Sequence, residues 1–204
     1  FTRYVIDKAL GAAAEWAREG VVVPISVNIS ARSLLDPRLP ADVAELLRRH
    51  GVPPRRLVLE ITETVVMSEL DVIDEVLAGL RGAGVQLAVD DFGTGYSSLT
   101  FLTRIAVDEL KVDRAFVAKM IDSPKAAAIV RTTVDLAQEL GLRVVAEGVE
   151  TAEQRAALAA LGCSAAQGYH FFRPMPPDKV VTVLRSLLDG APAKVFPLRA
   201  DGVS

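Results

Sequence analysis

The sequence predicts an α/β fold in which parallel strands alternate with helices and close into a (β/α) barrel. Three observations support it: short apolar runs alternate with longer amphipathic segments, the runs are nearly continuous in Val, Leu and Ile, and they end near polar side chains. Strands buried on both faces have this composition, and repeated strand–helix units produce parallel strands with right-handed crossovers. We therefore expect one sheet whose strands all run in the same direction.

Six runs have the composition of buried strands. They are 21–28, 57–61, 85–90, 107–112, 142–147 and, more weakly, 165–171. Two of the segments between them, 69–82 and 124–140, carry apolar residues at helical spacing. The expected helix faces consist of Leu70, Ile73, Leu77 and Leu80 in the first segment and Ile129, Thr133, Leu136 and Leu140 in the second.

Local signals mark where helices begin and end. Ser123 followed by Pro124 is typical of a helix start, and Thr151 with Gln154 has the spacing of a capping box. Three glycines fall where helices are expected to stop, namely Gly82, Gly84 and Gly141. These signals divide the chain consistently with the strand–helix alternation.

Polar side chains lie at or near the end of each strand run. They are Asn28, Glu60, Asp90 with Asp91, Lys111, Glu147 and Gln167. A single acidic residue at such a position often caps the following helix. Six successive runs with this feature indicate instead a shared site, because the carboxyl ends of barrel strands converge on one mouth. An open sheet would spread these residues apart, and the chain has no G-x-G-x-x-G or Walker loop to favour that alternative.

The side chains expected at this mouth offer oxygen ligands. Crowded carboxylates raise one another's pKa unless cations neutralise them. Two histidines, His50 and His170, and one cysteine, Cys163, do not supply a usual zinc site. Mg²⁺ or Mn²⁺ fits carboxylate and amide oxygens, and two such ions activate water for displacement at phosphorus. The pattern predicts phosphodiester hydrolysis.

The Asp90–Asp91 pair has two interpretations. Asp91 either caps a loop or short helix that begins at Phe92, or the pair binds two ions with one carboxylate bridging them. The two glycines that flank Thr94 favour a tight loop that closes over a site. Lys111 likewise either forms a structural salt bridge, for instance with Asp113, or orients the attacking water and neutralises the phosphate.

Composition limits the class of protein. The chain has 204 residues, half of them apolar, and a formal net charge of −3, so we expect one globular domain and no binding of a DNA or RNA duplex. A single cysteine suits a reducing cytoplasm, and no apolar run is as long as a membrane span. We therefore expect a cytoplasmic domain.

Six motifs occur in the order found in EAL domains, and together they cover nearly the whole chain. They are ISVNIS (25–30), LVLEITET (57–64), AVDDFGTGYSSL (88–99), ELKVDRAFV (109–117), VVAEGVET (144–151) and QGYHFFRP (167–174). The chain thus resembles the EAL domain family. The resemblance implies a modified TIM barrel that hydrolyses cyclic di-GMP to linear pGpG with two Mg²⁺ or Mn²⁺ ions.

The resemblance also implies roles for individual residues. Asn28, Glu60, Asp90, Asp91 and Glu147 would bind the metal ions. Lys111 would hold the hydrolytic water, Asp113 and Gln167 would support the site, and Glu150 would anchor the loop 92–99 that links metal binding to dimerisation. Asp91, Gln167 and Arg173 would contact the substrate.

The chain departs from the family pattern in two places. The Glu-Ala-Leu motif that names the family is absent, since AEW (14–16) and AEL (44–46) lie in helical patterns at the wrong place. About two N-terminal strands are thus expected to be missing, which would leave the barrel open and the isolated chain inactive or poorly folded. The second departure is Phe172, which replaces a usually small residue and either narrows the guanine pocket or belongs to the core.

The resemblance extends to domain organisation and partners. We expect residues 1–190 to form the EAL domain and 191–204 to be a linker or disordered tail. A homodimer and an upstream GGDEF, PAS or other sensory domain are expected by analogy. Two other functions remain open: an inactive EAL domain that serves as a cyclic di-GMP receptor, and an unrelated (β/α) barrel such as a metal-dependent aldolase.

Overall fold

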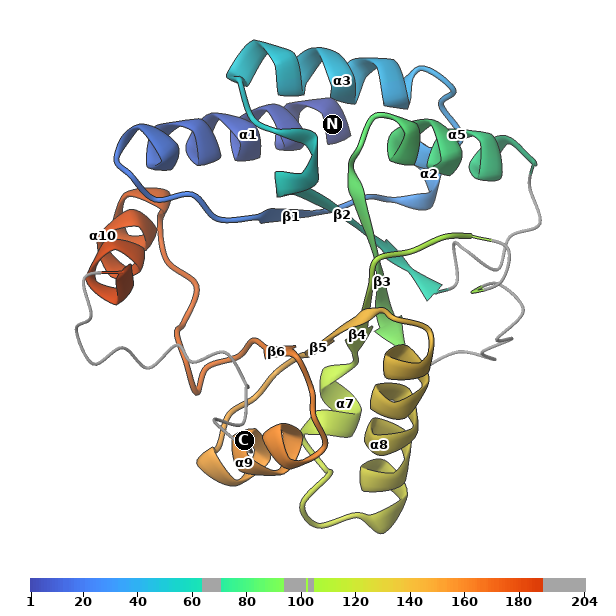
Figure 1. The fold of residues 1–204 in the computed structure, drawn as a ribbon, viewed down its shortest axis with the longest axis vertical. Helices are drawn as coiled ribbons and strands as arrows, with labels where there is room; N and C mark the ends of the chain where they lie inside the picture. The colour runs from blue at the N-terminus through green and yellow to red at the C-terminus, as the bar shows by residue number, and fades with distance from the viewer. Residues whose placement is uncertain (64–70, 94–101, 103–104, 189–204) are drawn as a thin grey trace.

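The computed structural model shows a single six-stranded sheet, and it describes residues 1–63, 71–93, 102 and 105–188. All six strands are parallel, and their spatial order follows the chain, β1-β2-β3-β4-β5-β6. The strands are β1 Ile25–Asn28, β2 Leu57–Thr62, β3 Gln86–Phe92, β4 Glu109–Val112, β5 Arg143–Ala146 and β6 Ala165–Ala166. The strands form a half-barrel with β1 and β6 as its two edges, in agreement with the incomplete (β/α) barrel expected from the sequence (Figure 1).

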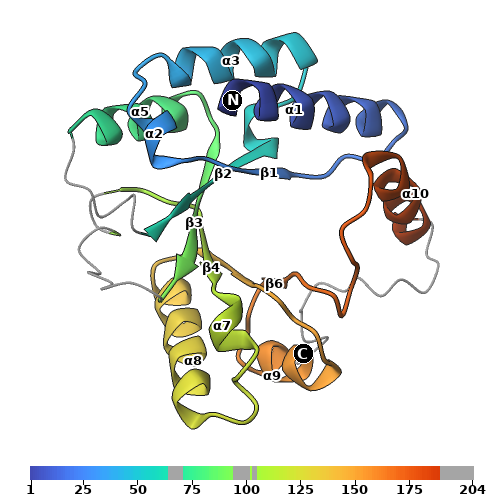
Figure 2. The same cartoon turned by 180° about the vertical axis from the view of Figure 1, so that it is seen from behind.

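Helices and one short 3-10 helix connect the strands. They are α1 Thr2–Arg18, α2 Ala31–Leu34, α3 Leu39–His50, η1 Pro54–Arg56, α5 Asp71–Gly82, α7 Arg114–Val117, α8 Pro124–Glu139, α9 Ala152–Ala160 and α10 Pro177–Leu188. Figures 1 and 2 show α1, α3 and α5 beside the first strands and α7, α8 and α9 beside the last ones. None of the described helices combines the length and apolar character needed to cross a membrane.

Two strands are shorter than their apolar runs. β1 begins at Ile25 because Pro24 has no backbone N–H to donate to a neighbouring strand. β6 ends at Ala166, and Gly168 then brings the chain so close to Val149 that a Cβ at position 168 would overlap the Val149 backbone. The turn replaces the second half of the expected strand at 165–171.

Most of the local helix signals are confirmed. Ser123 accepts a hydrogen bond from the Ala126 N–H at 3.3 Å, and Thr151 forms the capping box with Gln154. The expected face of α8 is confirmed only in part: Thr133 is buried and Leu136 packs against the core, whereas Leu140 lies just beyond the helix and is 48% exposed. The residues of α8 that are buried are Ala126, Val130, Thr133, Val134 and Ala137. Small and β-branched side chains let this helix approach β4 and β5 closely, whereas the larger ones lie at its margin.

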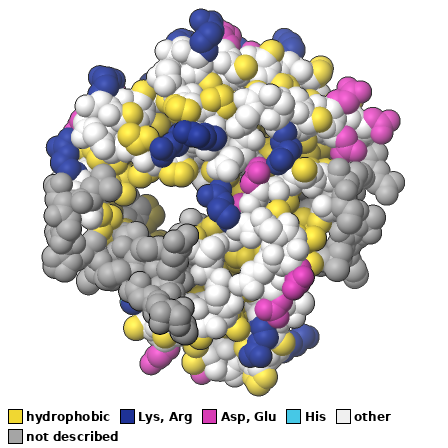
Figure 3. All heavy atoms as spheres, in the orientation of Figure 1, with side chains coloured by type: hydrophobic (Ala, Val, Ile, Leu, Met, Phe, Trp, Pro, Cys, Tyr) yellow, Lys and Arg dark blue, Asp and Glu magenta, His cyan; other side chains and the backbone are white. Residues whose placement is uncertain are grey.

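The alternation of side chains along the strands separates an apolar from a polar face. Leu110 and Val112 of β4 are fully buried and belong to the apolar core shared with the helices. Glu109 and Lys111 point to the opposite, inner face because successive residues of a strand alternate. The space-filling view shows an opening in the molecule beside this half-barrel (Figure 3). The candidate site therefore lies on the inner face, toward the carboxyl ends of the strands.

Candidate metal centre and adjoining cavity

A β-bulge places both aspartates of the Asp90–Asp91 pair at the site. Val89 pairs with Leu110 and Phe92 pairs with Val112, so two residues of β3 lie opposite the single residue Lys111 of β4. Asp91 takes the left-handed backbone conformation with φ = 56°, which is uncommon for a residue other than glycine. The bulge interrupts the alternation of the strand, so that neither aspartate side chain is turned away from the site.

Three carboxylates converge at this bulge. One carboxylate oxygen from each of Asp90, Asp91 and Glu147 lies within 4.8 Å of the other two. Glu147 directly follows β5, and its backbone N–H donates to the Val112 carbonyl at 3.0 Å. Oxygen donors at this spacing fit a hard divalent cation such as Mg²⁺ or Mn²⁺.

Lys111 provides the positive charge within the cluster. Its Nζ lies 2.7 Å from Glu60 Oε2, 3.1 Å from Asp90 Oδ1 and 2.6 Å from Glu147 Oε1. Burial acts to lower the pKa of Lys111, but the hydrogen bonds to Glu147 and Glu60 outweigh it and raise that pKa. The side chain is only 4% exposed, yet the ammonium stays charged because carboxylates surround it.

Neither Lys111 nor Asp91 makes the contact that a purely structural role predicted for it. Asp113 is not among the carboxylates paired with Lys111; it caps α7 by accepting from the Ala115 N–H at 2.6 Å. Residue 92 belongs to β3, so Asp91 does not cap a helix at that point. Burial, a hydrogen bond with Asp113 and the charge of Asp90 together raise the pKa of Asp91.

The remaining predicted ligands lie around this cluster. Asn28 is the register partner of Glu60, although its side chain is exposed. Glu60 is oriented by Lys111 rather than joined to the three-carboxylate group. Gln167 donates from Nε2 to Glu147 Oε1 at 2.7 Å and therefore lies beside the carboxylate cluster.

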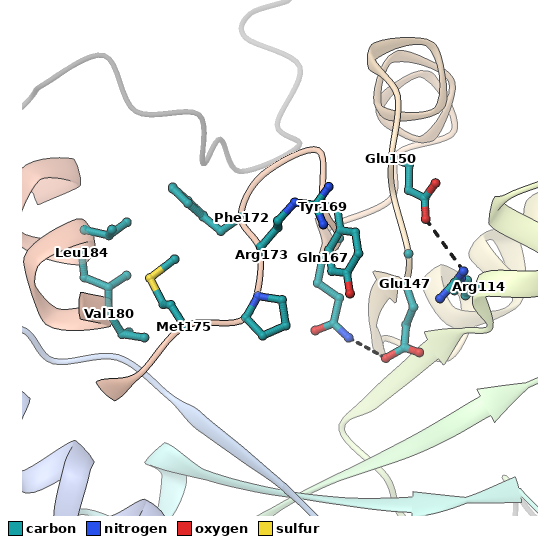
Figure 4. Close-up of a pocket in the computed structure, with 14 residues that line it drawn as sticks. Arg114, Glu147, Glu150, Gln167, Tyr169, Phe172, Arg173, Met175, Val180 and Leu184 are labelled. Carbon is teal, nitrogen blue, oxygen red and sulfur yellow. Dashed lines mark hydrogen bonds and ion pairs between the residues drawn. The ribbon is translucent and has the colours of Figure 1, made fainter. Parts of the chain in front are cut away.

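A cavity of about 620 Å³ adjoins the carboxylates. Figure 4 shows its polar end, with Glu147 and Gln167, opposite an apolar end beside α10. Arg173 stacks over the ring of Tyr169 at 4.8 Å, and Phe172 lines the cavity wall. These three residues thus share a cavity with Glu147, one of the three carboxylates of the candidate metal centre.

Two residues at the site were not identified from the sequence. Glu63 is buried and accepts from the Gly93 N–H at 3.1 Å, so it fixes the chain directly after β3. Arg114 lines the cavity and lies 3.9 Å from Glu150. Both residues lie within motifs quoted above, Glu63 in LVLEITET (57–64) and Arg114 in ELKVDRAFV (109–117), and this was the signal available. The part of the 92–99 loop beyond Gly93, like the tail 191–204, lies outside the described residues.

Comparisons with known proteins agree with this arrangement. The family model of the EAL domain matches residues 1–174. The bifunctional diguanylate cyclase/cyclic di-GMP phosphodiesterase MucR of Pseudomonas aeruginosa is 42% identical over 157 residues, which are 77% of this chain and 23% of that protein. The chain spans 21–44% of the length of the curated relatives that it matches.

Solved structures show the same fold. The EAL domain of Mycobacterium smegmatis DcpA matches with a TM-score of 0.86 and 37% identity, over 91% of this chain and 84% of that one. Klebsiella pneumoniae BlrP1 in a manganese/cyclic di-GMP complex matches with a TM-score of 0.79 and 36% identity, over 85% of this chain and 44% of that one. The fold, the ordered motifs and the family match agree: this chain belongs to the EAL domain family.

Proposed function

We propose that this domain hydrolyses cyclic di-GMP to linear pGpG. The observation that carries the proposal is the convergence of Asp90, Asp91 and Glu147 around Lys111, beside a cavity large enough for a small-molecule substrate. Related proteins indicate the substrate. MucR is named a cyclic di-GMP phosphodiesterase, and its phosphodiesterase structure is a cyclic di-GMP complex.

The residues present fit a pair of divalent cations. Asp90, Asp91 and Glu147 would hold them, with Asn28 and Glu60 on the neighbouring strands as further ligands. When bound, two such ions activate water and stabilise in-line displacement at phosphorus. BlrP1 has been solved with manganese and with calcium, which supports Mg²⁺ or Mn²⁺ as the working metal here.

The protein's own groups position the reactants. Lys111 is held between Glu60, Asp90 and Glu147, where it would orient the attacking water and neutralise the reacting phosphate. Gln167 fixes the Glu147 carboxylate, and Asp113 supports Asp91. Water adds across one P–O3′ bond: its oxygen joins phosphorus, and the ribose 3′ oxygen leaves with a proton.

Other residues and partners complete the proposal. Arg173 would contact the substrate from the cavity wall beside Tyr169, and Glu150 would anchor the loop after Gly93. We also propose that the domain works as a homodimer in the cytoplasm, attached to a GGDEF, PAS or other sensory domain. Relatives such as the oxygen sensor protein DosP support the signalling context, and a buried, unpaired Cys163 suits a reducing compartment.

Turnover by the natural full-length protein tests the function. With Mn²⁺ or Mg²⁺, chromatography should show cyclic di-GMP converted to pGpG, and Glu147→Gln should reduce the rate at least about 100-fold, as expected for loss of a charged group at the reacting centre. Calorimetric binding of cyclic di-GMP without any turnover would instead identify a receptor. Retention of the acidic cluster favours the enzyme.

A further inference from the structure

We infer that Arg114 binds a phosphate of the substrate, at the phosphodiester that is not being hydrolysed. The inference rests on the proposed function, because it adds a substrate contact to the same site. Arg114 is the first residue of α7 and follows the Asp113 cap at the carboxyl end of β4. It therefore lines the cavity from the helix that directly follows the strand carrying Lys111.

The Arg114 side chain has a defined position on the cavity wall. Its aliphatic stem lies over Gly148, where an added Cβ would approach Arg114 Cβ to 2.8 Å and Cδ to 2.9 Å. Gly148 also has φ = 67°, a conformation that other residues rarely adopt. The absence of a side chain at 148 thus lets Arg114 lie beside Glu147, and Figure 4 shows the two side chains near one another.

The charge of Arg114 is largely uncompensated. Within the described part of the chain its carboxylate partner is Glu150, at 3.9 Å, and the two side chains are 70% and 52% exposed. Lys111, by contrast, is buried among three carboxylates. An exposed guanidinium with such a long ion pair is ready to exchange it for a stronger, bidentate contact with a phosphate.

The chemistry of the substrate calls for a second cation. A cyclic dinucleotide carries two phosphodiester groups, each with one negative charge, and only one of them can react at the carboxylate cluster. The described cavity lining contains two cationic side chains, Arg114 and Arg173. Arg173 is stacked on Tyr169, whereas Arg114 lies beside Glu147, the member of the three-carboxylate group that lines the cavity (Figure 4). Arg173 is thus engaged with an aromatic ring, and Arg114 is the lining cation that is available for the second phosphate.

Steady-state kinetics on two substrates test this role in the natural full-length protein. For Arg114→Gln we expect the KM for cyclic di-GMP to rise about tenfold, as for loss of one charge-assisted hydrogen bond at a half-open site, with kcat changed less than about twofold. Hydrolysis of bis(4-nitrophenyl) phosphate, which has a single phosphodiester, should not change. Arg114→Lys should recover part of the affinity, and Arg38→Gln, at an exposed arginine outside the cavity, serves as the matched control.

Each outcome separates this inference from the proposed function. An unchanged KM for cyclic di-GMP in Arg114→Gln, or an equal loss on both substrates, would overturn the phosphate contact while leaving the phosphodiesterase intact. If the wild-type protein binds cyclic di-GMP without hydrolysing it, the function fails, and calorimetry should still show about tenfold weaker binding for Arg114→Gln. A wild-type protein that neither binds nor hydrolyses cyclic di-GMP would overturn both.

Discussion

The amino ends and the carboxyl ends of the parallel strands both carry charged side chains, but they balance these charges differently. At the amino ends, Arg81 pairs with Asp108 at 3.0 Å and Arg143 pairs with Glu109 at 3.2 Å. The Asp108 carboxylate also accepts a hydrogen bond from the Leu87 N–H at 2.9 Å and thereby holds the start of β3 in place. Each of these pairs joins one cation to one carboxylate.

At the carboxyl ends, negative charge is in excess. Lys111 contacts three carboxylates, and Asp91 adds a fourth whose pKa is raised by burial, by Asp113 and by Asp90. A site arranged only for stability would not concentrate like charges in this way, because their repulsion opposes folding. This difference in charge balance indicates that the charged residues at the amino ends are structural and that those at the carboxyl ends are suited to bind cations.

The largest effect is expected from removing the central cation. Lys111→Met should lower the free energy of unfolding in EDTA by about 3–5 kcal/mol, because it leaves buried carboxylates without their partner. Arg143→Met at the other end should cost only about 0–1 kcal/mol, since the Arg143 side chain is 47% exposed. Urea unfolding measures both. Equal losses would show that the two ends are not distinguished by their charge balance.

An intermediate effect is expected from metal binding. At a Mn²⁺ concentration 100 times its Kd, the free energy of unfolding should rise by about 2.7 kcal/mol over its value in EDTA. Asp90→Asn should abolish most of this gain, whereas Asp108→Asn at the amino ends should retain it. Thermal unfolding with and without Mn²⁺ provides the measurement. A gain that survives in Asp90→Asn would place the metal elsewhere.

The smallest effect concerns pH at the amino ends. Burial raises the pKa of Glu109 above its ordinary value of 4.5, against the opposing charge of Arg143. The folded state therefore holds this proton more tightly than the unfolded state, so the associated stability is present below pH 4.5 and is lost as pH rises through the folded pKa. Glu109→Gln should thus gain on the wild type, by at most about 1 kcal/mol, between pH 4.5 and neutrality. A difference that does not vary with pH would contradict this assignment.

Much of the fold and of the candidate site could be predicted because local patterns encode them. Apolar runs located the six strands, and polar residues such as Glu60 and Glu147 near the strand ends indicated the mouth of the barrel. The bulge at Asp90 and Asp91 could not be predicted, because it depends on the register between β3 and β4. The partners of Lys111 were also beyond reach, since they come from three other strands or strand ends.

The α8 face shows a different limit of sequence reasoning. Helical spacing alone favoured the larger apolar residues, and Leu140 proved to be exposed. Tertiary packing selected Ala126, Val130 and Ala137 instead, because close approach to the sheet rewards small side chains. The role of Arg114 was missed for a related reason. Arg114 and Gly148 are far apart in the sequence, and only the folded chain brings the arginine side chain over the glycine.

The close approach at Gly168 holds the loop after β5 against the loop after β6. Val149 donates to the Gln167 carbonyl at 3.0 Å and accepts from the His170 N–H at 2.9 Å, so the chain after β5 and the chain after β6 are stitched on both sides of the glycine. Together with the hydrogen bond from Gln167 Nε2 to Glu147 Oε1 at 2.7 Å, these contacts fix Glu147 and Gln167 relative to one another. A ligand that displaces Arg173 or Tyr169 would therefore also displace the Glu147 carboxylate through these hydrogen bonds. Substrate binding would in this way affect the position of a group at the reacting centre.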